Sequence, residues 1–418
     1  MKNNIFTKEV LEKIELLYDN NEETKERYLN AVNTFKKLYK RDDFNIFSAP
    51  GRTEIIGNHT DHQRGMAMAG SVNLDVIGVA AKNNSDFVRV VSFGYEKEDI
   101  VNVNELDIRE HEKERSVSLI RGIVKAFVDL GYKVGGLDIY VSSNVLKGSG
   151  LSSSAAFEVL IATIVNHMYC DAKEDAISIA KIGKYAENVY FGKPCGLLDQ
   201  LASSVGGFVY MDFCDNSNPK VEKIELNYKK EGYTLCILDT GGSHADLTND
   251  YADISGELKK ISQHFGKEVL REVPEDDFIR EIKMLREKAG DRAVLRAFHV
   301  YEENKRVETA KNCLKEKDFN GFLQILKVSG NSSFKYLQNV YSPSDTKQQG
   351  LALALLLAEK ILKDKGAFRV HGGGFAGTIQ AFVPNELVDE YVSEMESVFG
   401  KGKCHKLFVR PLGATKIL

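Results

Sequence analysis

The sequence has no uninterrupted apolar run of about 18 residues, the minimum for a membrane-spanning helix. The most apolar stretch, residues 351–357, is followed closely by Glu359 and Lys360, so we expect a buried helix there. The first 40 residues are charged and helix-patterned, and they lack the apolar core of a signal peptide. We therefore expect a cytoplasmic protein with no membrane partner.

Closely spaced cysteines are also missing, as is a strong excess of either charge. None of the six cysteines lies two or three residues from another, which argues against zinc knuckles and redox pairs and favours reduced thiols. The formal net charge is −4, which argues against general nucleic-acid binding. We expect no nucleic-acid partner and a monomer as the assembly state.

Repeats and low-complexity tracts are absent, and 418 residues exceed what one core ordinarily fills. Predicted strands and helices mix without strict β–α–β alternation, which favours an α+β fold. A polar turn segment, residues 215–219, separates two halves. We expect domains over residues 1–213 and 214–418, with the active site in the cleft between them.

Small and hydroxyl residues gather at residues 146–156, between a predicted strand and a predicted apolar helix. Glycines let backbone N–H groups approach an anion, and three serines open the helix, where the dipole favours negative charge. A serine cap would explain one hydroxyl but not three. The motif is not a Walker A loop, because Gly-Lys-Ser/Thr is missing. We interpret the segment as a phosphate-binding loop.

A second glycine-rich run covers residues 371–377 and places glycines at 372, 374 and 377. A dinucleotide fingerprint would need a helix next, whereas residues 378–383 are strand-like. A protein-kinase loop is excluded, because neither His-Arg-Asp nor Asp-Phe-Gly occurs. We predict a strand–loop–strand glycine loop beside a ligand, with a ligand-free hairpin as the alternative.

Hydrogen-bonding side chains crowd residues 51–62, which contain few apolar anchors. Asn58, His59 and Asp61 supply donors and acceptors suited to sugar hydroxyls. Zinc is a weaker interpretation, because His59, Asp61 and His62 have no further ligand cluster. A solvated turn is the third interpretation of this segment. Asp199 also allows two interpretations, a helix cap or a carboxylate that takes part in the chemistry.

Together these segments resemble the GHMP small-molecule kinases, the family of galactokinase, homoserine kinase, mevalonate kinase and phosphomevalonate kinase. Residues 51–62 and 195–200 resemble two galactokinase signatures, and residues 150–156 resemble the family's phosphate loop. The glycine run resembles its third motif, and the order of all four agrees over about residues 44–384. The resemblance implies the family's two-domain fold. It also implies an ATP-dependent sugar 1-kinase that converts D-galactose to galactose 1-phosphate and ADP.

The resemblance also implies residue roles. Asp199 matches the catalytic carboxylate and Arg52 its cationic neighbour; whether Asp199 is a base or an orienting group stays open. Ser154 and Glu187 match the magnesium ligands, as a hydroxyl and a carboxylate would suit that ion. The ATP-binding loop would comprise Gly148, Ser149, Gly150, Leu151, Ser152, Ser153, Ser154 and Ala155. The sugar pocket would use Asn58, His59, Asp61, Gly196 and Tyr251, the last from a loose match spanning His244 to Tyr251.

Three positions depart from the galactokinase signature, with Glu54 for Asn, Asn58 for Glu and His62 for Tyr. The family's Glu lies near the sugar's C6 hydroxyl. Asn58 either preserves a hydroxyl contact, with Glu54 replacing the lost acceptor, or admits a sugar with a carboxylate at C6. Galacturonate, N-acetylgalactosamine and arabinose are therefore alternative substrates. A sensor that binds sugar and ATP without turnover is the non-catalytic alternative.

Overall fold

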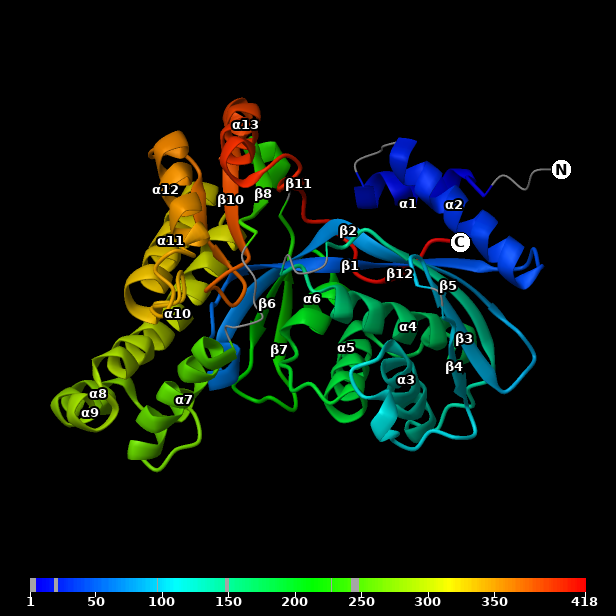
Figure 1. The fold of residues 1–418 in the computed structure, drawn as a ribbon, viewed down its shortest axis with the longest axis horizontal. Helices are drawn as coiled ribbons and strands as arrows, with labels where there is room; N and C mark the ends of the chain where they lie inside the picture. The colour runs from blue at the N-terminus through cyan, green and yellow to red at the C-terminus, as the bar shows by residue number, and fades with distance from the viewer. Residues whose placement is uncertain (1–4, 19–21, 96, 147–149, 227, 242–247) are drawn as a thin grey trace.

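The strands that the structure describes form two sheets, each covered by helices (Figure 1). The structure is a computed structural model that describes residues 5–18, 22–95, 97–146, 150–226, 228–241 and 248–418. Within these residues the larger sheet has eight strands and the smaller has four. The predicted α+β fold class is confirmed.

The larger sheet runs in the order β12-β1-β2-β5-β3-β4, with β6 and β7 continuing from β2. Its pairs are antiparallel except β3 with β5. Its strands are β1 Asn45–Ile56, β2 Met66–Lys82, β3 Phe87–Ser92, β4 Asp99–Asn102, β5 Leu137–Ser143, β6 Phe208–Asp212, β7 Lys220–Ile224 and β12 Thr415–Lys416.

Helices cover both faces of this sheet, because β2 buries side chains on each side. Ile77 and Val79 pack with the helices α1 and α2, whereas Gly78 faces α4. Figure 1 shows α1 and α2 on one face and α3 to α6 on the other. These helices are α1 Lys8–Tyr18, α2 Glu22–Tyr39, α3 Ser116–Asp129, α4 Ser153–Tyr169, α5 Ala176–Tyr185 and α6 Leu198–Val205.

The smaller sheet follows the order β11-β8-β10-β9 and is antiparallel. One face packs on α12 and α13, and the other packs on α11 and the main core. Helices α7 to α10 form a separate apolar cluster beside it. The strands are β8 Tyr233–Asp239, β9 Ala367–His371, β10 Thr378–Pro384 and β11 Cys404–Leu407. The helices are α7 Thr248–His264, α8 Glu275–Arg280, α9 Ile282–Ala289, α10 Asp291–Lys315, α11 Phe319–Ser332, α12 Gly350–Leu362 and α13 Val388–Phe399.

The last part of the chain returns to the larger sheet. The Asn73 N–H donates to the carbonyl of Phe408 at 3.1 Å, and the Arg410 N–H donates to the carbonyl of Ser71 at 2.8 Å. The sequence predicts a strand over residues 406–410, but β11 ends at Leu407, because the backbone beyond it bonds to β2 instead. The domain division at residues 213 and 214 stays a prediction.

Two further elements are longer or less regular than their sequence predicts. The sequence predicts a short strand at residues 44–47, whereas β1 extends to Ile56, because a register shift carries it past Pro50. The sequence predicts one helix over residues 175–190, whereas α5 ends at Tyr185 and a π-helical turn, Ala186–Phe191, follows it. Across the residues described, every helix is too short or too polar to span a bilayer.

A buried polar network joins the loop after β1 to helices α10 and α11. The Glu303 carboxylate accepts from the backbone N–H of Gly57 at 3.1 Å, the Ser329 hydroxyl at 2.5 Å and Arg306 Nε at 2.7 Å. Burial opposes ionisation of Glu303, but neighbouring His299 and Arg306 outweigh it and lower its pKa to about 2. The network therefore contains a buried carboxylate with several donors.

His299 lies in the same network as a neutral imidazole. Its Nε2 lies 3.0 Å from the carbonyl of Asn58, so Nε2 carries the hydrogen, and Nδ1 accepts from the Ser332 hydroxyl at 2.9 Å. The same hydroxyl accepts from Arg306 at 2.8 Å. Burial lowers the pKa of His299 to about 4, against the opposing pull of Glu303.

Acid should destabilise the protein through His299. Its folded pKa lies below the ordinary value, so between pH 6.5 and 4 the unfolded chain binds a proton that the folded chain excludes. The resulting loss of unfolding free energy reaches about 3 kcal/mol. We expect the free energy of unfolding of His299→Gln, measured in urea, to fall less steeply than that of wild type between pH 7 and 4.5. The exposed control His111→Gln should keep the wild-type slope, and a full slope in His299→Gln would contradict the assignment.

Candidate active site

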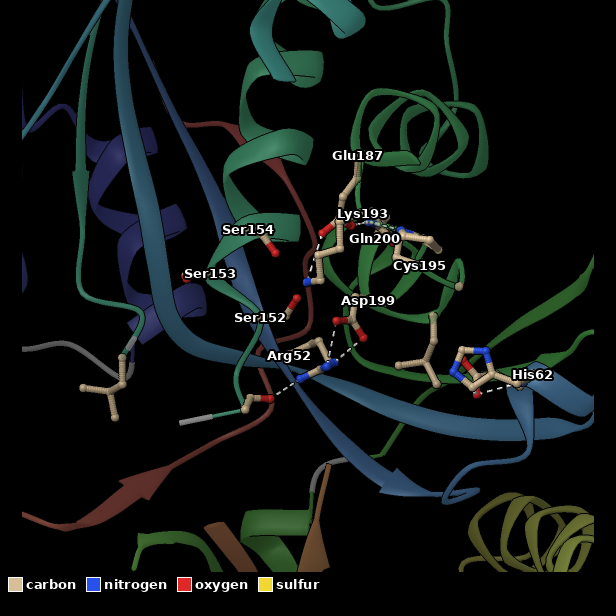
Figure 2. Close-up of a pocket in the computed structure, with 16 residues that line it drawn as sticks. Arg52, His62, Ser152, Ser153, Ser154, Glu187, Lys193, Cys195, Asp199 and Gln200 are labelled. Carbon is tan, nitrogen blue, oxygen red and sulfur yellow. Dashed lines mark hydrogen bonds and ion pairs between the residues drawn. The ribbon is translucent and has the colours of Figure 1, made fainter. Parts of the chain in front are cut away.

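Segments far apart in the sequence surround a cavity of about 410 Å³ (Figure 2). They are β1, the loop after it, the start of α4, the π-helical turn and the loop leading into α6. The lining residues are Arg52, Asp61, His62, Leu146, Gly150, Ser152, Ser153, Ser154, Glu187, Lys193, Pro194, Cys195, Gly196, Leu198, Asp199 and Gln200. Three of the four sequence motifs thus meet at one cavity.

Arg52 joins the predicted catalytic carboxylate to the predicted phosphate loop. Its Nε and Nη2 each lie 2.7 Å from an oxygen of Asp199, which is a bidentate pair. Its Nη1 donates to the carbonyl of Gly150, and its backbone N–H donates to the carbonyl of Leu151 at 2.9 Å. Figure 2 shows the guanidinium between the loop and the carboxylate. The sequence-predicted pair therefore forms in the structure.

The loop lies directly against β1, and this contact requires a glycine in the strand. A Cβ on Gly51 would lie 2.8 Å from the carbonyl oxygen of Leu151. Gly150 and Ser152 both have left-handed backbone, with φ of 74° and 56°, and this turns the chain into α4. In the described part of the loop the Ser152 side chain makes no capping hydrogen bond. Its hydroxyl faces the cavity, as phosphate binding requires.

The other predicted loop residues divide into two groups. Gly150, Ser152, Ser153 and Ser154 line the cavity. Leu151 and Ala155 are buried in the protein core instead. Gly148 and Ser149 lie outside the described residues, and so does His244 of the Tyr251 match.

Glu187 is held in the π-helical turn by neighbours on both carboxylate oxygens. Its Oε1 lies 3.3 Å from Lys193 Nζ, and its Oε2 accepts from Gln200 Nε2 at 2.9 Å. Gln200 Nε2 also donates to Glu158 Oε2 at 2.9 Å. Burial, reinforced by the nearby Glu187 charge, raises the pKa of Glu158. Sequence reasoning missed Glu158 and Gln200; a lone acidic residue in the apolar stretch 157–168 was the available signal.

The oxygen donors at Ser154 and Glu187 suit a magnesium ion. Both side chains line the cavity, and Glu187 already binds a cation there, the Lys193 ammonium. The described residues contain no group of three His, Cys, Asp or Glu side chains arranged to hold a metal. A metal bound here would therefore take few protein ligands, which is common for magnesium beside a phosphate group.

Asp61 and Gly196 form the predicted sugar side of the cavity. A Cβ on residue 196 would lie 2.7 Å from Asp61 Oδ2, so the carboxylate requires a glycine opposite it. Asp61 Oδ1 accepts the backbone N–H of His62 at 2.9 Å, which fixes the side-chain direction. Asp61, His62 and Gly196 all line the cavity.

His59 and Tyr251 contact the glycine loop of the second sheet. His59 Nε2 lies 2.8 Å from the carbonyl of Gly373, and the Tyr251 hydroxyl donates to the carbonyl of Gly374 at 2.8 Å. Burial lowers the pKa of His59 and raises the pKa of Tyr251 to about 12. Neither is among the described residues that line the cavity, so their roles as sugar ligands stay predictions.

Asn58 is buried between Glu54 in β1, Asn339 and the glycine loop rather than on the cavity wall. Its Nδ2 donates to Glu54 Oε1 at 3.0 Å and to the carbonyl of Gly372 at 2.7 Å. Its Oδ1 accepts from Asn339 Nδ2 at 2.7 Å. Burial raises the pKa of Glu54 to about 7 against the pull of Arg369. The predicted contact of Asn58 with the C6 position stays untested, and its amide is occupied by these partners.

The glycine run forms the predicted loop between two strands, β9 and β10. Its carbonyl groups accept from Asn58, His59 and Tyr251, so it packs on the sugar signature. His371, just before the loop, lies 2.8 Å from the Thr378 hydroxyl through Nδ1. Burial lowers the pKa of His371 to about 3. Sequence reasoning gave no role to this side chain.

Replacing the Asn58 amide with a carboxylate should destabilise the protein. Asn58→Asp would place a carboxylate against Glu54 and the carbonyl of Gly372, where two donated hydrogen bonds now exist. We expect a loss of about 2–4 kcal/mol in urea unfolding. The loss should be larger at pH 8 than at pH 6, because Glu54 ionises near pH 7. The exposed control Asn218→Asp should unfold as wild type does, and equal stability of the two variants would refute this account.

Family models match two parts of the chain. Residues 33–82 match the galactokinase galactose-binding signature, and residues 118–207 match the GHMP kinases N terminal domain. A galactokinase of Clostridium tetani is 29% identical over 371 residues, which cover 88% of this chain and 91% of that protein. A galactokinase of Streptomyces coelicolor is 28% identical over 365 residues, which cover 87% and 91%.

Solved structures share the fold. Lactococcus lactis galactokinase complexed with galactose superimposes with a TM-score of 0.77 and 21% identity, over 92% of this chain and 98% of that chain. A mevalonate kinase superimposes with a TM-score of 0.61 and 16% identity, over 87% and 98%. With both signatures, the motif order and the fold in agreement, this chain is similar to the GHMP kinases over most of its length and matches the galactokinase galactose-binding signature.

Proposed function

We propose that this chain is an ATP- and magnesium-dependent sugar 1-kinase that converts D-galactose to galactose 1-phosphate and ADP. The observation that carries the proposal is the Arg52 guanidinium, which pairs with Asp199 and contacts the carbonyl of Gly150 in one cavity. Phosphoryl transfer depends mainly on alignment and charge stabilisation, and this arrangement supplies both. The curated relatives named as galactokinases support galactose as the sugar.

The nucleotide side of the cavity is the phosphate loop. The hydroxyls of Ser152 and Ser153 and the start of α4 would receive the phosphate oxygens. Ser154 and Glu187 would hold magnesium, which supplies neutralisation of phosphate charge when bound. Arg52 would stabilise the charge that develops on the transferred group.

The sugar side is formed by Asp199, Asp61 and Gly196. Asp199 would accept the proton of the anomeric hydroxyl or orient that hydroxyl toward the phosphate. Asp61, with two acceptor oxygens, would bind neighbouring ring hydroxyls. The Asn58 amide is bonded to Glu54 and the glycine loop, so it offers no donor for a sugar carboxylate. This favours galactose over galacturonate.

Removing the carboxylate charge at residue 199 should abolish most turnover. We expect Asp199→Asn to keep the wild-type thermal midpoint within a few degrees and to lower kcat by about a thousandfold, because an amide cannot replace the charge. ADP release from ATP with galactose measures the effect. The exposed control Asp215→Asn should match wild type. Near-normal turnover in Asp199→Asn would remove the residue from the mechanism.

The substrate is tested by kcat/KM for galactose, N-acetylgalactosamine, arabinose and galacturonate. We expect galactose to lead by about tenfold or more, because Asp61 suits neutral ring hydroxyls and Asn58 is occupied. A higher kcat/KM for galacturonate than for galactose would contradict the proposed sugar but not the proposed kinase activity. Absence of ADP release with every sugar would favour a sensor that binds without turnover.

A further inference from the structure

Lys193 is a cavity residue with no role in the proposed function so far. It lies in the loop between the π-helical turn and α6, and it lines the cavity with Ser152 and Ser154. Figure 2 shows its side chain directed into the cavity beside Glu187, toward these serines. An ammonium group is therefore presented to the proposed phosphate site.

The backbone holds Lys193 firmly while its side chain stays exposed. The backbone N–H groups of Gly192 and Lys193 donate to the carbonyl of Glu187, at 3.0 and 3.2 Å. The Lys193 side chain is 62% exposed, whereas the Glu187 side chain is 4% exposed. The contact between them, at 3.3 Å, is long for a charge-assisted hydrogen bond, so Glu187 holds this exposed ammonium weakly. The base of the side chain is therefore fixed, and its charged end can change partner.

The charge of the cavity also points to Lys193. Of the described residues that line it, three are acidic (Asp61, Glu187 and Asp199). Two are basic, with the Arg52 guanidinium and the Lys193 ammonium as their charged groups. A nucleotide polyphosphate brings further negative charge and requires cations. The Arg52 guanidinium already donates to both oxygens of Asp199 and to the loop. By contrast, the Lys193 ammonium contacts Glu187 Oε1 at the longer distance of 3.3 Å.

We propose that Lys193 binds the phosphate oxygens of the nucleotide and rests on Glu187 when the nucleotide is absent. The inference builds on the proposed function. Phosphate oxygens offer the ammonium more negative charge than the one carboxylate that now holds it, so the nucleotide alone would draw Lys193 away from Glu187, and a divalent cation bound at Glu187 would reinforce this movement. The four sequence motifs do not indicate this role, because residue 193 lies outside all of them.

The rival role for Lys193 is to hold Glu187 in place for the metal. The two roles differ when magnesium is absent. A phosphate ligand contributes to ADP affinity without metal, whereas a support for Glu187 affects only metal-dependent binding. Titration of the full chain with ADP in excess EDTA, and again in magnesium, therefore separates them.

The test compares Lys193→Met and Lys193→Arg with wild type. We expect Lys193→Met to weaken ADP binding in EDTA by about ten- to a hundredfold, as loss of one charge-assisted hydrogen bond implies. Lys193→Arg keeps the charge and should restore most of the affinity. Lys113→Met is the control, because Lys113 is an exposed lysine paired with Glu110 at 2.8 Å, outside the cavity lining. Thermal midpoints confirm that each variant is folded.

Equal ADP affinity of Lys193→Met and wild type in EDTA would overturn the inference, and so would a loss that Lys193→Arg fails to restore. A change confined to the KM for galactose would also overturn it. Failure of the proposed function looks different: wild type would bind ADP yet release none from ATP with any sugar. In that case the EDTA comparison still decides the role of Lys193.

Discussion

A single guanidinium holds the site together. Arg52 sits in the middle of β1, so its backbone is fixed by the sheet, and its side chain contacts both the carboxylate on α6 and the carbonyl of the phosphate loop. The glycine before it lets the loop approach the strand. Three separate segments are thereby set at fixed distances, and alignment of this kind is what phosphoryl transfer needs.

The carboxylates around the cavity would repel one another without specific partners. Asp199 is held by Arg52, Glu187 by Lys193 and Gln200, and Glu158 by the same Gln200. The amide of Gln200 donates its two hydrogens to the buried carboxyl groups of Glu158 and Glu187, so it links them without adding a charge. The cavity lining therefore has more acidic than basic side chains, which suits a nucleotide that binds together with a cation.

The local sequence motifs predicted the residues that line the site better than the residues that hold those side chains in place. The serines, Asp199 and Asp61 belong to compact motifs, and the resemblance to known kinases implies that they share one site. Glu158, Asn339 and His371 could not be found that way, because each acts on a motif more than 25 positions away in the chain. The fold class was predictable from mixed strands and helices, whereas the return of the chain end to the larger sheet depends on long-range pairing.

The position of Asn58 has an evolutionary consequence. Its side chain forms hydrogen bonds with Glu54, Asn339 and the glycine loop, so residue 58 is tied to positions that lie far apart in the sequence. A lineage that altered this residue alone would lose several partners together. A tolerated change at residue 58 therefore requires coordinated substitutions, and residues 54, 58 and 339 should vary as a set among relatives of this chain.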